Sequence, residues 1–78
     1  MSAQSRRKVL EVLERHHHGQ GRTGAMLDDE PIATELQMTI EGVQDDLEAL
    51  EALGHAQLAK SFEGMSALIT PRGRLALE

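Results

Sequence analysis

Three consecutive histidines are the residues of this sequence best suited by type to bind a metal ion. His16, His17 and His18 end a helix-like stretch, and imidazole is a common ligand of zinc and copper. Successive helical residues project about 100° apart, however, so three in a row cannot converge on one ion. Glu14 could join His17 or His18, but the chain has no cysteine and His55 is distant in sequence. We therefore expect no metal site.

A glycine-rich stretch over 19–24, GQGRTG, is the second feature that could do chemistry. Phosphate-binding loops of this kind connect a strand to a helix, whereas this one follows a helical pattern. It is interpreted as a connecting loop. The sequence also offers no nucleophile with a plausible base and orienting partner, and its small core leaves no room for a substrate pocket. We expect neither an enzyme nor a cofactor.

Length and composition indicate one domain over 1–78. Phe62 is the only aromatic residue, so Leu, Ile, Val, Met and Ala must build the core, which suits short helices with a small sheet. The absence of cysteine favours a reducing compartment, and we expect a cytoplasmic protein. No apolar run is long enough to span a membrane.

Charge is distributed unevenly along the chain, whose net charge is −5. Between residues 23 and 59 there is no lysine or arginine, and all eight basic residues lie outside that segment. The same segment contains nine carboxylates: Asp28, Asp29, Glu30, Glu35, Glu41, Asp45, Asp46, Glu48 and Glu51. We expect Asp45, Asp46 and Glu48 to be exposed, and such a surface opposes non-specific attraction to a polyanion.

Hydrophobic periodicity predicts four helices, over 5–18, 31–37, 39–53 and 71–77. Shorter apolar runs predict a brief strand at 25–27 and a hairpin with strands near 55–61 and 66–70. The residues expected in the core are Val9, Leu13, Ile32, Leu36, Val43, Leu47, Leu50, Leu58 and Ile69.

Helix and turn signals support these boundaries. Ser5 or Ser2 is expected to cap the first helix, and Thr39 the third. Gly54 is expected to end the third helix, and Gly64 to supply the hairpin turn. Thr70 with Pro71 is expected to open the last helix, because proline is tolerated in a first turn.

This order of elements resembles the winged helix-turn-helix superfamily of transcriptional regulators. The segments that carry the resemblance are Ile32–Leu36 with Met38 and Thr39, the series Val43, Leu47, Leu50 and Gly54, and Leu68–Arg74. The helix-turn-helix is expected at about 31–53 and the wing at about 55–70. Gln37 departs from the pattern, because this turn position is often glycine. A positive φ there costs about 1 kcal/mol.

The resemblance implies a non-catalytic domain that binds double-stranded DNA, with its third helix in the major groove. Thr39 and Gln44 are then the candidate base-reading residues. The candidate phosphate contacts are Arg6, Arg7, Lys8, Lys60, Arg72 and Arg74. The carboxylates of the third helix favour an alternative, in which the domain binds no DNA and uses that helix to dock a basic protein surface or to dimerise.

Several apolar residues are also expected to exceed what the small core can absorb. They are Met26, Ile40, Phe62, Met65 and Leu77. Exposed apolar patches tend to mark interfaces, so a homodimer is expected, in which the last helix packs against a second copy. The alternative is a monomer with Phe62 and Met65 in solvent at the tip of the wing.

Overall fold

The computed structural model describes residues 3–19, 26–62 and 64–78, and within them it contains four helices and one three-stranded sheet. The elements are α1 (Ala3–Gly19), β1 (Leu27–Asp28), α2 (Asp29–Leu36), α3 (Ile40–Ala52), β2 (Ala56–Ser61), β3 (Gly64–Ile69) and α4 (Pro71–Ala76). The sheet order is β1-β3-β2, and both pairs are antiparallel. None of the described helices combines the length and hydropathy needed to cross a bilayer.

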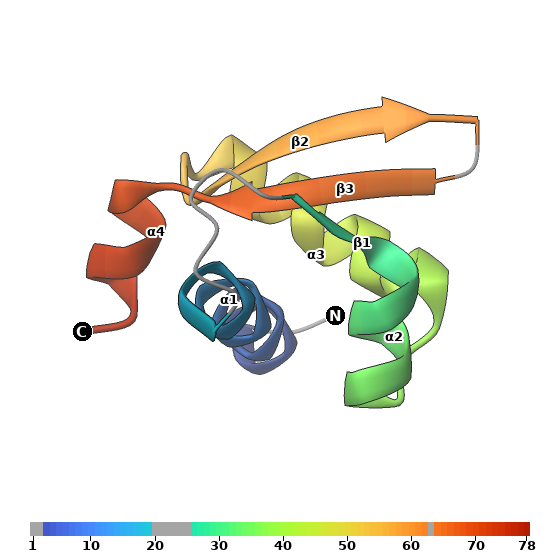
Figure 1. Ribbon diagram of the computed structural model, residues 1–78, viewed down its shortest axis with the longest axis horizontal. Coiled ribbons are helices and arrows are strands. Elements are labelled where there is room, and N and C mark those ends of the chain that lie inside the picture. The colour runs from blue at the N-terminus through green and yellow to red at the C-terminus, as the bar shows by residue number, and fades with distance from the viewer. Residues whose placement is uncertain (1–2, 20–25, 63) are drawn as a thin grey trace.

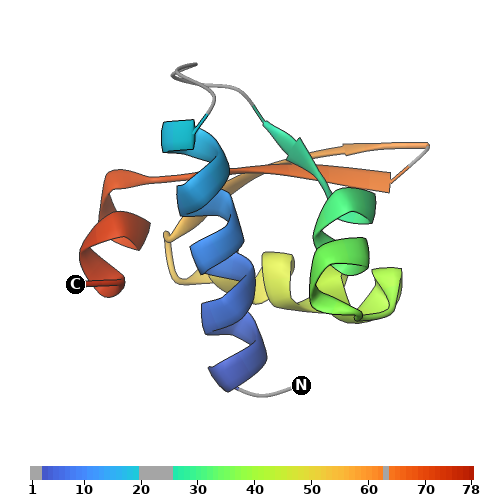
Figure 2. The ribbon, with the colours of Figure 1, turned by 60° about the horizontal axis from the view of Figure 1, so that its bottom comes forward.

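Three helices cover one face of the sheet, and the fourth lies at its end. Figure 1 shows α1 and α2 below the strands and α3 rising behind them, with α4 on the left and the far ends of β2 and β3 on the right. The view in Figure 2 keeps α4 and those strand ends at opposite ends of the molecule. The hairpin pairs Ser61 with Gly64 at its tip and Ala56 with Ile69 at its base.

The core forms between α1, the helix-turn-helix and the inward face of β3. Its buried residues are Val9, Leu10, Val12, Leu13, Ile32, Ala33, Val43, Leu47, Leu50, Ala56, Met65, Ala67 and Ile69. Leu36 and Leu58, which were expected in the core, are only half-buried and pack against it. Leu58 lies on an edge strand, whereas β3 is central and buries alternate residues. That alternation also buries Met65, which was wrongly expected to remain outside the core.

Side-chain caps fix two of the helix starts. The Thr39 hydroxyl accepts a hydrogen bond from the Gly42 amide at 3.0 Å. The Thr70 hydroxyl accepts one from the Gly73 amide at 3.0 Å and donates to the Gly54 carbonyl at 2.6 Å. Both predicted caps are confirmed, and Gly54 has the expected left-handed backbone, with φ 77°.

The beginning of the chain differs from the prediction. α1 already starts at Ala3, so Ser5 is inside the helix and its hydroxyl donates to Asp46 instead of capping. Ser2 lies outside the described residues. The first strand occupies Leu27–Asp28 and not 25–27, because β1 pairs with Ser66 and Ala67 of β3; residue 25 is outside the described range.

Candidate nucleic-acid interface

The turn between α2 and α3 sets the orientation of the third helix. Gln37 adopts φ 54° and ψ 44°, which confirms a left-handed residue at this position without glycine. The Met38 amide donates to the Ala33 carbonyl at 2.9 Å, and Thr39 then starts α3. Buried Val43, Leu47 and Leu50 hold one side of α3 against the core, so the opposite side faces outward.

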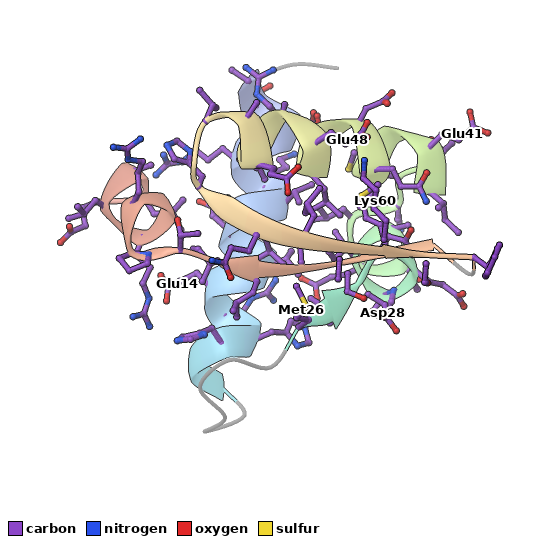
Figure 3. All side chains as sticks on the ribbon, turned by 90° about the horizontal axis from the view of Figure 1, so that it is seen from above. Glu14, Met26, Asp28, Glu41, Glu48 and Lys60 are labelled. Atoms are coloured by element: carbon purple, nitrogen blue, oxygen red, sulfur yellow. The ribbon has the colours of Figure 1, made fainter. Side chains whose placement is uncertain are left out.

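The outward side of α3 carries a row of carboxylates. Glu41, Asp45 and Glu48 are exposed at spacings of four and three residues, which places them on one face of the helix. We call these three residues the acidic face. Figure 3 shows Glu41 and Glu48 along α3 and Lys60 between the wing and the helix.

Lys60 of β2 joins the wing to the acidic face. Its Nζ donates to Glu48 Oε2 at 3.0 Å. This hydrogen bond and the charge of the Glu48 carboxylate raise the pKa of Lys60 above its ordinary value. The side chains are 59% and 49% exposed, so the pair adds little to stability. Lys60 therefore carries its charge at neutral pH, with a carboxylate beside it.

Asp29 connects α2, α3 and the wing. It is buried, and its Oδ2 accepts hydrogen bonds from Gln44 Nε2 at 2.7 Å and from the Met65 amide at 3.2 Å. A Cβ on Gly64 would come within 2.8 Å of the same oxygen, and Gly64 has φ 141°. Glycine thus lets the wing approach the carboxylate. Because an ionised carboxylate only accepts, Gln44 must turn its amide nitrogen towards Asp29.

Asp46 does not belong to the exposed surface of α3, contrary to the sequence-based expectation. Its side chain is 1% exposed, and Oδ2 accepts from the Ser5 hydroxyl at 2.8 Å. Oδ1 is buried with no hydrogen-bond partner among the described residues. The first turn of α1 holds no acidic residue of its own, so Asp46 brings a negative charge to the positive end of that helix.

Four of the candidate phosphate-binding residues gather around α1 and α4. Arg7 donates to the carbonyls of Ala76 at 3.5 Å and Leu77 at 3.3 Å, and it pairs with Glu11. Arg74 pairs with Glu14 at 3.2 Å. Arg72 lies against Gly54, and Arg6 lines a groove with Leu77. We call Arg6, Arg7, Arg72 and Arg74 the arginine end.

The remaining candidates lie on α1, on α3 and on the wing. Lys60 is on the wing beside α3, and Lys8 is exposed on α1. Thr39 is exposed at the start of α3, where its hydroxyl already accepts the capping hydrogen bond. The sequence could not reveal Asp29 as the residue that positions Gln44, since 15 residues separate them. Among the described residues, no three His, Asp or Glu side chains are grouped to hold a metal ion.

Comparison with solved structures places this architecture among known proteins. A putative DNA-binding protein of Ralstonia eutropha JMP134 superposes with a TM-score of 0.79, at 23% identity, over 99% of this chain and 94% of its own. The YusO protein of Bacillus subtilis superposes with a TM-score of 0.73 at 17% identity, over 94% of this chain and 48% of its own. A MarR family transcription regulator superposes with a TM-score of 0.70 at 18% identity, over 94% of this chain and 45% of its own.

These likenesses concern the fold, because all the identities are below 25%. This chain spans about half the length of YusO and of the MarR family regulator. No protein-family model matches the sequence, and a comparison with curated proteins gives no match. The helix-turn-helix formed by α2 and α3, with the β2–β3 wing beside it and α1 packed against it, gives the chain a winged helix-turn-helix fold.

Proposed function

We propose that this chain is a non-catalytic DNA-binding module of the transcription-regulator type. The observation that supports the proposal is its complete helix-turn-helix and wing, shared over nearly the whole of both chains with the Ralstonia protein. α3 turns one side outward next to the wing, and in domains of this architecture that arrangement fits the major groove of duplex DNA.

Gln44 and Thr39 are the proposed base-reading residues of α3. Asp29 accepts one hydrogen of the Gln44 amide nitrogen at 2.7 Å, so the second hydrogen and Oε1 are the groups left to meet a base. A bidentate contact to adenine needs both a donor and an acceptor. Gln44 keeps one donor and one acceptor, so the contact to adenine that the sequence indicated stays available, with the amide held in one orientation by Asp29.

Electrostatics separates two modes of DNA contact. If the duplex lies on α3 and the wing, Lys60 is the candidate phosphate contact on that side, and the acidic face keeps non-specific affinity low. If the duplex lies on the arginine end, four cations are available. The slope of log affinity against log salt concentration would then be about −1 in the first mode and about −3 to −4 in the second.

Fluorescence anisotropy with a random-sequence duplex over a range of salt concentrations tests the proposal. We expect the shallow slope, with Lys60→Gln weakening binding and Arg72→Gln, the matched control, leaving it unchanged. A steep slope that Arg72→Gln makes shallower by about one would move the interface to the arginine end. If no duplex binds, including duplexes from a random-sequence selection, the DNA-binding proposal is wrong.

The acidic face supports a second candidate function, docking of a basic protein surface. Asp45→Asn combined with Glu48→Gln should leave or increase affinity for random duplex, because repulsion of phosphates is removed. Under this second candidate, the same double variant loses binding to a basic partner. The expected homodimer stays a prediction. Its apolar surfaces at Met26, Ile40 and Phe62 are exposed, whereas Leu77 is half-buried.

A further inference from the structure

The tip of the wing presents an aromatic ring to solvent. Phe62 is fully exposed, although it is the only aromatic residue of the chain. It follows Lys60 and Ser61 at the end of β2, where the hairpin turns back to Gly64. A lone phenyl ring held at the end of a short hairpin is a surface feature that burial against another molecule would stabilise.

An open apolar groove lies between α1, the end of α3 and α4. It has a volume of about 160 Å³. Its lining consists of Ala3, Arg6, Arg7, Leu10, Leu50, Leu53, His55, Ala76 and Leu77. A cavity of roughly 150 Å³ lined by aliphatic side chains accommodates benzene, so this groove is of a size to receive one phenyl ring. Leu53 is 50% exposed at the groove and would gain most from an occupant.

The groove and the recess beside the wing tip carry charges of opposite sign, and the nearby Lys60 is paired with Glu48. Arg6 and Arg7 belong to the groove lining. At the wing, Ser61 and Gly64 share a polar recess with Asp28, Asp29 and Glu30. Such complementarity favours contact between the wing of one molecule and the groove of another.

The two features lie at opposite ends of the molecule. In both Figure 1 and Figure 2 the β2–β3 turn is at the far end from α4, so one chain cannot place its own Phe62 in its own groove. We propose that this chain associates head to tail, with Phe62 of one copy inserted into the α1–α4 groove of the next. Such an interface is heterologous, so each dimer keeps one free ring and one free groove and can add further copies.

Sedimentation equilibrium of the protein without DNA tests this proposal independently of the proposed function. For the unmodified chain we expect an average mass that rises with concentration from 8.6 kDa and does not saturate at the dimer. Phe62→Ala removes the ring, and Leu53→Glu places a carboxylate in the groove. Each should weaken association at least about tenfold. Leu75→Glu is the matched control, because Leu75 is an exposed leucine of α4 that does not line the groove.

Mixing the two defective variants provides the decisive measurement. The groove of the Phe62→Ala chain is intact, and so is the ring of the Leu53→Glu chain, so an equimolar mixture should form a one-to-one complex. That complex should not grow, because its remaining tip and remaining groove are both defective. Circular dichroism checks that each variant is folded, and Leu53→Gln replaces Leu53→Glu if the latter is not.

Several results overturn the proposal. They are a constant monomer mass into the millimolar range, saturation at the dimer, an equal effect of Leu75→Glu, and failure of the mixture to assemble. Phe62→Trp adds a further measurement, since the chain has no other tryptophan. Its emission should shift to shorter wavelength as concentration rises. A change seen only on addition of duplex DNA would assign the ring to DNA and would also overturn the proposal.

Discussion

The two ends of this small domain use charge in different ways. On the acidic face, Glu41, Asp45 and Glu48 are exposed, and Glu48 forms an ion pair with Lys60. At the arginine end, Arg7 and Arg74 are tied into the fold by hydrogen bonds to α4 carbonyls and by an ion pair with Glu14. The carboxylates of the acidic face form an exposed surface, whereas Arg7 and Arg74 of the arginine end hold α1 and α4 together.

Close packing at α4 predicts the largest mutational effect. A Cβ on Gly73 would lie 2.2 Å from the His55 carbonyl oxygen, which is backbone and cannot move aside. Gly73→Ala should therefore lower the free energy of unfolding by about 3 kcal/mol or more, a large part of what a domain of this size has. Urea unfolding measures it. Gly42→Ala in α3 is the control, since its Cβ would meet only side chains, at 3.1 Å or more.

If Gly73→Ala unfolds at the same urea concentration as the unmodified protein, the contact between α4 and the base of the wing is looser than described. If Gly42→Ala lowers the free energy of unfolding as much as Gly73→Ala, close packing does not distinguish α4 from α3. We expect Gly42→Ala to be near neutral, because the gain in helix propensity, about 1 kcal/mol, offsets a small displacement of the Thr39 hydroxyl.

The connection of the wing to α3 depends on Asp29. Asp29→Ala leaves the Gln44 amide and the Met65 amide without their acceptor, and it should lower stability by about 1–3 kcal/mol. Asp29→Asn keeps one acceptor oxygen and should lose less. Hydrogen exchange at the Met65 amide is the local measurement. Unchanged protection of that amide in Asp29→Ala would mean that Asp29 does not hold the wing in place.

Asp45 and Asp46 are neighbours in sequence but belong to different environments, and their substitution tests this contrast. Asp46→Ala removes the acceptor of the Ser5 hydroxyl and the charge at the start of α1, so we expect a loss of about 1–2 kcal/mol. Asp45→Ala should change stability by less than about 0.5 kcal/mol, because Asp45 is exposed. Similar losses for both would contradict the assignment of Asp46 to the α1 contact.

The smallest expected effect concerns the pH dependence of the Lys60–Glu48 pair. The pKa of Lys60 is raised in the folded protein, so its contribution to stability is present below the pKa of the unfolded chain. That contribution is lost as the pH rises through the raised value. NMR titration of Lys60 should give a higher pKa in the unmodified protein than in Glu48→Gln. The same pKa in both would mean that the ion pair is not formed in solution.

Local sequence signals were sufficient for most of the fold. The apolar residues of 5–18, 31–37 and 39–53 have a helical period that the core confirms, and Thr39, Thr70 and Gly54 mark helix ends by their own chemistry. At Gln37 the sequence left the turn geometry open, and the structure has a positive φ there. Errors arose where pairing between strands decides burial, as at Leu58 on the edge and Met65 in the centre of the sheet.

The sequence by itself therefore determined the elements, their order and the negative charge of the middle segment. Only the tertiary structure decided what each polar residue does. Asp46 is buried because α1 crosses α3 at that position, and Gln44 is engaged because the wing and α2 bring Asp29 to it. These partners are 41 and 15 residues apart, and periodicity describes only neighbours within a turn or two of a helix, so no local pattern could have indicated them.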